Sequence, residues 1–151
     1  MKLYIESSVV NFVYADDAPD KTETTKNFFE PSNGKHELFI SELVLEEIEK
    51  TQSPKREKMS NFVVTHDFRV LPNSAEADNL ASKYVKAGLV PEKYINDAIH
   101  LALASVNKME VLVSWNMEHI VKLKTIVGVN KINKEQGYGN ILIMTPEEVL
   151  E

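Results

Sequence analysis

The sequence predicts an α/β protein with a central parallel sheet of about five strands and helices on both faces. Three observations support this prediction. Short apolar runs of strand length alternate with longer helical stretches along the whole chain. Cap and turn residues mark most of the boundaries between them. The 151 residues, 43% apolar and 26% charged, match one globular domain spanning 1–151, without internal repeats or a linker.

Five apolar runs are predicted as strands: 2–5, 37–40, 68–71, 111–114 and 141–144. They are short and rich in aliphatic and aromatic residues. Runs of this kind are typical of strands that helices bury in a parallel sheet. Ligands of such folds bind beyond the carboxyl ends of the strands, so the residues that follow each run are the first candidates for function.

Helices are predicted between the strands, from Ser7 or Ser8 to about 14, then at 21–30, 42–50, 54–64, 74–88, 91–108 and 117–134. Ser74 and Thr145 are suitable helix caps, and Thr145 opens a last short helix. Gly88 is a C-terminal stop, and Gly128 is predicted to break its helix. Residues 31–35 are predicted as a turn, and 16–20 as a loop.

Glu47 and Asp97 are acids on the apolar faces of their helices. At 100° per residue, Glu47 falls between Leu43 and Val44, whereas the other acids of that helix fall outside the apolar arc. Asp97 lies inside the apolar arc of 91–108. Burying a carboxylate costs free energy unless it gains a partner. Asp97 therefore indicates either a ligand or a structural partner, whereas Glu47 either binds a ligand or lies at the edge of the apolar face with its carboxylate in water.

Glu6 and Asn116 follow the first and fourth predicted strands. In isolation, Glu6 could simply favour a helix N-terminus, and Asn116 could be a helix cap. Carboxyl ends of parallel strands meet at one edge, so these two residues are expected to converge there with Glu47 and Asp97. Several acids in one place predict a divalent cation held by oxygen ligands.

Composition restricts the classes of function. The absence of cysteine excludes disulfides and thiolate metal sites. The N-terminus resembles neither a signal peptide nor a membrane span, so a cytoplasmic location without membrane contact is expected. A net charge of −6 argues against a purely electrostatic nucleic-acid binder, but not against a local basic rim. Candidate rim residues are Lys55, Arg56, Lys58, Lys122 and Lys124.

Three aromatic residues near these acids have structural interpretations. His100 lies in the polar gap of its helix and is predicted to be solvated. His119 is predicted to support its helix rather than bind metal. Trp115, the one tryptophan, is expected to pack in the core, with stacking on a nucleic-acid base as the alternative.

The chain resembles the PIN domain family, and most closely its VapC-like toxin branch. The resemblance covers nearly the whole chain and rests on the order and spacing of five segments. These are 4–9 (YIESSV), 40–48 (ISELVLEEI), 96–104 (NDAIHLALA), 112–120 (LVSWNMEHI) and 143–148 (IMTPEE).

The resemblance implies a three-layer α/β/α sandwich whose acids bind Mg²⁺ or Mn²⁺ and support hydrolysis of RNA phosphodiesters. It also implies an RNA substrate, an antitoxin protein as partner and a homodimer, as for the toxin of a type II toxin–antitoxin pair. The matching catalytic and metal-binding residues are Glu6, Glu47, Asp97 and Asn116, with Ser7 and Ser114 as hydroxyls that orient ligands or phosphate.

Two departures from the family pattern leave alternatives open. Glu6 stands where most of the family has Asp, and Asn116 stands where many relatives have Asp. The second hypothesis is therefore a catalytically weakened PIN-like scaffold that acts as an RNA-binding or protein-interaction module. A third is a metal-assisted phosphatase, but that enzyme would need a nucleophilic Asp directly after the first strand, and Glu6 stands there.

Overall fold

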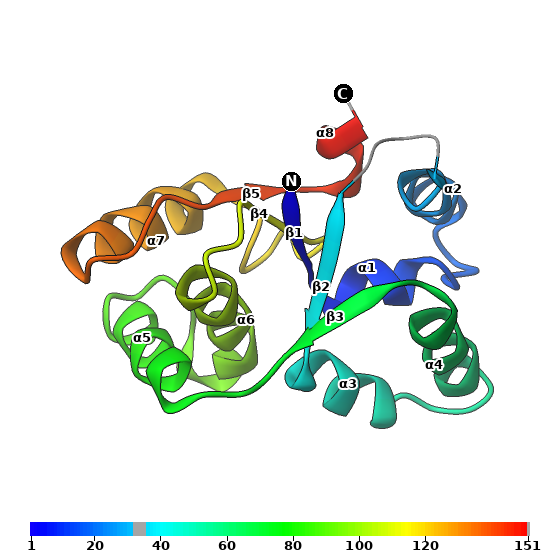
Figure 1. Cartoon of the computed structure of the whole chain (residues 1–151), viewed down its shortest axis with the longest axis horizontal. Coiled ribbons are helices and arrows are strands. Elements are labelled where there is room, and N and C mark those ends of the chain that lie inside the picture. Colours follow the sequence, from blue (N-terminus) through cyan, green and yellow to red (C-terminus); the bar gives the residue numbers. More distant parts are fainter. Residues whose placement is uncertain (32–35, 151) are drawn as a thin grey trace.

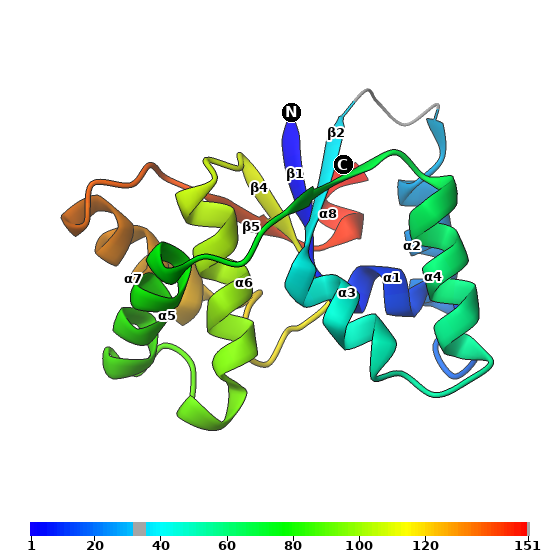
Figure 2. The same ribbon diagram turned by 60° about the horizontal axis from the view of Figure 1, so that its bottom comes forward.

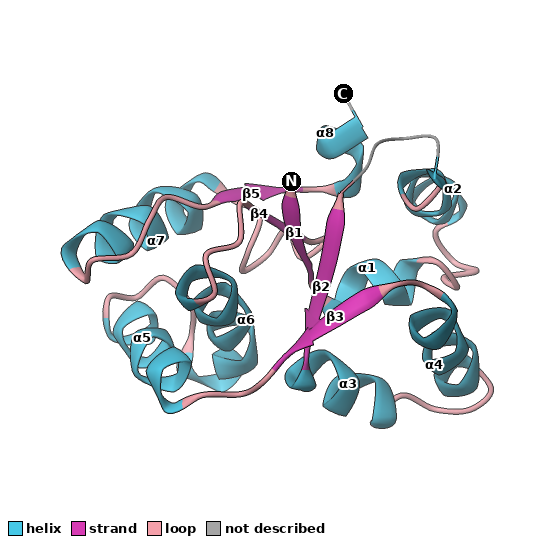
Figure 3. Cartoon of the chain, viewed as in Figure 1, coloured by secondary structure: helices cyan, strands magenta, loops and turns pink. Residues whose placement is uncertain are grey.

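The computed structural model describes residues 1–31 and 36–150 and has a five-stranded, fully parallel sheet in the order β3-β2-β1-β4-β5 (Figures 1 and 3). The strands are β1 (Lys2–Ile5), β2 (Glu37–Ser41), β3 (Phe68–Leu71), β4 (Val111–Val113) and β5 (Leu142–Met144). The predicted α/β class is confirmed.

Helices cover both faces of the sheet, with α5, α6 and α7 on one side and α1 to α4 on the other (Figure 1). This arrangement is the expected three-layer α/β/α sandwich. The helices are α1 (Ser7–Phe12), α2 (Pro19–Phe28), α3 (Glu42–Glu49), α4 (Lys55–Thr65), α5 (Ala75–Lys86), α6 (Ile95–Val106), α7 (Leu123–Glu135) and α8 (Pro146–Leu150), with a 3₁₀ turn, η2 (Glu92–Tyr94), before α6.

The strand order reverses between β1 and β4. From β1 the chain adds β2 and β3 on one side, then returns to add β4 and β5 on the other. Tyr4 pairs with Phe39 on one side and with Leu112 on the other. In open parallel sheets, ligand sites lie at such a reversal, beyond the carboxyl ends of the strands. The residues that follow Ile5 and Val113 therefore lie where a ligand site is expected.

The core fills both faces of the central strands. Leu3, Tyr4 and Ile5 of β1 are inaccessible to solvent, as are all residues of β4. The edge strands β3 and β5 are partly exposed. This pattern explains why the predicted strands read as continuous apolar runs rather than as alternating ones. Within the described ranges, no helix has the length and apolarity needed to span a membrane.

Several predicted caps are confirmed. Ser74 Oγ accepts the Ala77 N–H at 3.1 Å and opens α5. Thr145 and Glu148 form a reciprocal capping box, with N···O distances of 2.9 and 3.1 Å. Gly88 follows α5 with φ 77°, a conformation that favours glycine at a helix end.

Some predicted helix starts are wrong. The first helix is capped by Glu6 rather than by a serine and ends at Phe12. α2 begins inside the predicted loop, because Pro19 suits the first helical turn. The helix predicted from 117 begins only at Leu123, since the Asn116 carbonyl accepts the N–H groups of both Ile120 and Val121 in a turn.

Gly128 does not break α7, contrary to the sequence prediction. It lies inside the helix, where the missing Cβ leaves room for the buried Leu89. The α6 helix is also shorter than predicted, because η2 precedes it. Most of the turn predicted at 31–35 lies outside the described residues.

Replacing Gly128 with alanine is expected to lower the free energy of unfolding by about 1 kcal/mol. An added Cβ would lie 2.3 Å from Cδ2 and 2.9 Å from Cδ1 of Leu89. Such overpacking costs about 1–3 kcal/mol, against about 1 kcal/mol gained from helix propensity. Urea unfolding measures the difference.

The control is Gly139→Ala, because a Cβ there meets no atom within 4 Å. We expect that change to alter stability by less than about 0.5 kcal/mol. In a Leu89→Ala background the loss caused by Gly128→Ala should disappear. A loss that persists in that background would show that the contact with Leu89 is not its cause.

Candidate functional site

Glu6 is a buried carboxylate at the point where the strand order reverses. It follows β1, and its backbone N–H donates to the Val113 carbonyl of β4 at 3.1 Å. Its own extended backbone caps α1, and Oε2 accepts the Ser8 N–H at 3.2 Å. The residue is only 5% exposed. A negative charge here is favoured by the N-terminus of α1 but still requires further donors.

Two serine hydroxyls supply those donors. Ser8 Oγ and Ser114 Oγ each donate to Glu6 Oε1 at 2.6 Å. Each hydroxyl oxygen in turn accepts a backbone N–H, that of Trp115 for Ser8 and that of Asn116 for Ser114, both at 2.9 Å. These bonds hold the hydroxyls in position to donate toward the carboxylate. Ser114 was predicted near the site, whereas the role of Ser8 was missed.

Glu47 reaches the same place from α3. Ser41 at the end of β2 caps this helix by accepting the Val44 N–H, which fixes where the helix begins. Glu47 Oε1 accepts the Ser7 hydroxyl at 2.6 Å and is 2.6 Å from His100 Nε2. Within the described chain, Oε2 accepts no hydrogen bond. The helical-wheel prediction that Glu47 turns inward is confirmed, and Ser7 lies beside it as expected.

His100 is fully buried, so the prediction of a solvated side chain is wrong. Its Nδ1 is 2.7 Å from the Tyr4 hydroxyl, which is 2.7 Å from Ser41 Oγ. Its Nε2 bonds Glu47. The polar gap on α6 therefore faces polar groups of β1, β2 and α3 rather than solvent. A helical wheel shows which side of a helix is polar, but not what covers that side.

The ion pair between His100 and Glu47 shifts the pKa of both groups. Burial alone lowers the pKa of His100, but the bond to Glu47 and the charges of Glu6, Glu47 and Asp97 outweigh it and raise the pKa above 6.5. Burial raises the pKa of Glu47, but His100, Ser7 and Lys50 outweigh it and lower the pKa below 4.5. Each partner of the pair therefore favours the charged form of the other.

Asp97 and Asn116 lie at the periphery of this cluster. Asp97 Oδ2 is 2.9 Å from Nδ1 of the buried His119. The backbone N–H of His119 donates to Asn116 Oδ1 at 3.0 Å. His119 thus supports a turn rather than the predicted helix, and it also holds Asp97. Asn116 caps this turn rather than a helix, so the simpler prediction of a helix cap is wrong, although its side chain does accept a backbone N–H.

Oxygen donors at the site suit a hard divalent cation. Ligand atoms of Glu6, Glu47 and His100 lie within 4.8 Å of one another. His100 has both ring nitrogens engaged, whereas Glu47 Oε2 and Asp97 Oδ1 accept no bond from the described residues. Carboxylate oxygens are the ligands that Mg²⁺ and Mn²⁺ prefer. The side chains present therefore fit the implied metal.

Trp115 packs in the core, as expected. It is 8% exposed, and its Nε1–H donates to the buried Thr25 at 2.8 Å. Its ring also contacts Phe12 at a centroid distance of 6.0 Å. An indole held in this way does not offer a face for base stacking.

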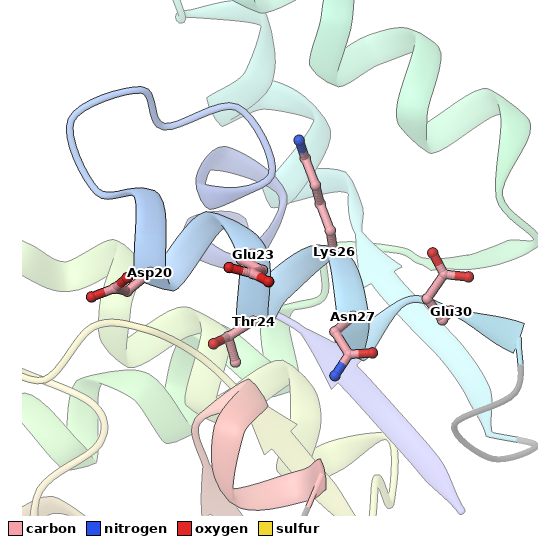
Figure 4. A pocket seen from close by; sticks show the side chains of 6 residues that line it. All are labelled: Asp20, Glu23, Thr24, Lys26, Asn27 and Glu30. Atoms are coloured by element: carbon pink, nitrogen blue, oxygen red, sulfur yellow. The ribbon is translucent and has the colours of Figure 1, made fainter.

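A hollow of about 520 Å³ lies along α2, and none of the candidate site residues lines it (Figure 4). Its lining consists of polar side chains of α2 and of Glu30, which follows that helix: Asp20, Glu23, Thr24, Lys26, Asn27 and Glu30. Five of the six are exposed and Thr24 is half-buried, so this hollow is an open and polar part of the surface. The cluster of Glu6 and Glu47 is therefore the candidate functional site because of its chemistry, although the hollow along α2 is large.

Solved structures of VapC proteins share this fold. The chain is 15% identical to a chain in the crystal structure of VapBC2 from Rickettsia felis bound to a DNA fragment from their promoter, with a TM-score of 0.61 over 96% of this chain and 98% of that one. It is 13% identical to VapC20 of Mycobacterium tuberculosis, a sarcin-ricin loop cleaving toxin, with a TM-score of 0.59 over 78% and 92%. No family model matches the chain, and no curated protein matches it in sequence. The PIN-like architecture expected from the motifs is thus confirmed as a fold.

In metal-free protein, the imidazole pKa of His100 is expected to lie above 6.5 and to fall in a Glu47→Gln variant. The stabilisation from charged His100 is then complete below pH 6.5 and is lost as the pH rises through the folded-state pKa. Glu47, whose pKa is lowered from 4.5, contributes above pH 4.5 and loses its contribution as the pH falls through the folded-state value.

Two-dimensional NMR of the histidine rings across pH 4–9 measures these titrations, since unperturbed histidine titrates near 6.5. His36 is the internal control, because burial near the N-terminus lowers its pKa independently of Glu47. A wild-type His100 that titrates below 6.5 would contradict the ion pair.

Proposed function

We propose that this chain, which has the fold of the VapC toxins, is a divalent-metal-dependent endoribonuclease and the toxin of a type II toxin–antitoxin pair. One observation carries the proposal: Glu6 and Glu47, from different elements, bring carboxylate oxygens together where the strand order reverses. Hydroxyl groups fix both carboxylates in place. Such a site is suited to a cation and to a phosphate bound on it.

Glu6, Glu47 and Asp97 are the proposed metal ligands. Glu6 Oε1 accepts hydrogen bonds from two hydroxyls, whereas Oε2 accepts only one within the described residues, from a backbone N–H at 3.2 Å. Oε2 is therefore the better metal ligand. Glu47 offers Oε2, and Asp97 offers the oxygen that His119 leaves free. Mg²⁺ or Mn²⁺, when bound, would lower the pKa of a coordinated water and offset negative charge on the scissile phosphate.

Hydrolysis by water suits the hydroxyls of this site. Ser8 and Ser114 donate to Glu6, and Ser7 donates to Glu47, so the hydroxyls hold the two carboxylates in place and water is the proposed nucleophile. Water attack forms a new P–O bond in line with the P–O3′ bond that breaks. The products are a 5′-phosphate and a 3′-hydroxyl.

Charge also favours a cation at this site. Glu6, Glu47 and Asp97 contribute three negative charges, and His100 contributes at most one positive charge beside them. An RNA phosphate would be repelled by this excess unless a cation offset it. The hydrogen bond to Glu47, together with these negative charges, raises the pKa of His100.

The weakened scaffold remains the second candidate, and two observations favour it. Asn116 Oδ1 caps a turn, so the amide is already engaged. Glu6 accepts three hydrogen bonds, which leaves fewer lone pairs for a metal. A protein of this kind would bind RNA without cleaving it.

An antitoxin protein, a homodimer and a cytoplasmic location complete the proposal. Support comes from the VapBC2 neighbour, whose structure is of a complex bound to promoter DNA. The site is open beside Glu47, so a partner polypeptide has access to it. Sedimentation analysis of the purified chain, alone and with its genomic neighbour, tests both associations.

Asp97→Asn is expected to reduce metal-dependent cleavage of a mixed RNA pool by at least about 100-fold. The change keeps the shape of the side chain but removes a charge from the metal site, and even supporting residues of metal sites contribute about 10–100-fold. Cleavage is measured with Mg²⁺ or Mn²⁺ and with chelator.

The matched control is Glu49→Gln, which neutralises an exposed acid on α3, the helix that carries Glu47. It should cleave as the wild type does. RNA binding without cleavage by pure wild type would favour the scaffold instead. Equal cleavage by wild type and Asp97→Asn would remove Asp97 from the site.

A further inference from the structure

A pocket of about 210 Å³ opens beside Glu47, on the side of α1, α3 and α4. These three helices pack against one another, and α1 lies between the other two in Figure 2. The side chains that line it are Ser7, Ser8, Asn11, Glu47, Ile48, Thr51 and Met59. The metal-ion account above uses only Ser7, Ser8 and Glu47 of this set.

The pocket has an apolar floor and a polar rim. The side chains of Met59 and Ile48 are each 2% exposed and form the apolar part of the lining. Thr51 Oγ1 donates to the Glu47 carbonyl at 3.2 Å, and its oxygen keeps lone pairs that accept. A ligand with an apolar face and a hydrogen-bonding edge would satisfy both surfaces.

Asn11 is a polar residue of this rim whose side chain is available to hydrogen-bond a ligand. It lies one helical turn after Ser7, so the two side chains share a face of α1. The residue is half-buried, and its carboxamide makes no hydrogen bond to the described part of the protein. A carboxamide offers a donor pair and an acceptor side by side. This combination matches the edge of a nucleobase.

We propose that this pocket receives one unpaired base of the RNA next to the scissile phosphate, and that Asn11 determines which base is accepted. The inference rests on the proposed ribonuclease function. The volume is below the 300–1,000 Å³ of sites for drug-sized ligands, and a single base is correspondingly smaller than such ligands. Reading a base by its edge requires an unpaired strand, so the substrate class is single-stranded RNA or a loop.

The position of the pocket supports this assignment. Glu47 lines the pocket and also belongs to the carboxylate cluster, so a base in the pocket has its phosphate directed to the cluster. Lys50 is exposed three residues after Glu47 and acts electrostatically on the Glu47 carboxylate. In this proposal, the ammonium group of Lys50 binds the phosphate next to the bound base. Contacts of this kind do not depend on the base sequence.

The first experiment compares the cleavage sites of wild type, Asn11→Ala and Asn79→Ala on a randomised single-stranded RNA, by sequencing the new 5′ ends. We expect wild type to prefer one base at a fixed position beside the cut. Asn11→Ala should still cleave but lose that preference by about 10-fold, as expected when a base-reading side chain is removed. Asn79 is exposed on α5, away from the pocket, so its variant should keep the wild-type preference.

A second readout is independent of cleavage. Each ribonucleoside 5′-monophosphate is added to ¹⁵N-labelled wild type in chelator, and the side-chain amide signal of Asn11 is followed by NMR. One monophosphate should shift this signal more than the other three, and the matching signals of Asn79 should not move.

The outcomes separate the two proposals. If wild type cleaves and Asn11→Ala keeps the same base preference, the pocket assignment is overturned while the ribonuclease stands. If wild type fails to cleave with either metal, the proposed function fails, and the monophosphate titration alone decides whether the pocket binds bases. The absence of any shift at Asn11 would overturn base binding there.

Discussion

The cost of burying Glu6 is the constraint on which the site depends. A carboxylate that is 5% exposed requires donors, and the chain supplies them from both strands beside the reversal point. Ser8 comes from α1, after β1, and Ser114 follows β4. Because their lone pairs are occupied by backbone N–H groups, their hydroxyls donate inward. The strand pairing of β1 with β4 and the charge of Glu6 therefore stabilise each other.

A second network joins the remaining central elements to the site. It runs from Ser41 through Tyr4 and His100 to Glu47, so it links β2, β1, α6 and α3. Burial raises the pKa of Tyr4, which keeps its hydroxyl protonated beside the imidazole. Substitution of any member leaves a buried polar group unpaired, at a cost of about 1–3 kcal/mol. The same bonds that stabilise the sandwich thus position Glu47.

The sequence predicted what depends on local pattern and missed what depends on tertiary partners. The wheel of α3 placed Glu47 inward because its neighbours are apolar, and the structure agrees. His100 was assigned to solvent because the wheel of α6 does not reveal that Tyr4 and Glu47 cover it. Nothing in the sequence indicated that Ser8 holds Glu6, apart from its position two residues later in the chain. Gly128 was interpreted as a helix break because glycine is unfavourable inside helices. The sequence could not show its close contact with Leu89, because the two residues are distant along the chain.

A Mn²⁺ soak of protein crystals, with anomalous diffraction, tests the central account most directly. If Glu6 and Glu47 form a metal site, an anomalous peak is predicted about 2.1 Å from an oxygen of each, with Asp97 as a further ligand, directly or through water. The Glu49→Gln protein should show the same peak. An empty space between the two carboxylates at millimolar Mn²⁺, or an ion bound elsewhere with none there, would contradict the account.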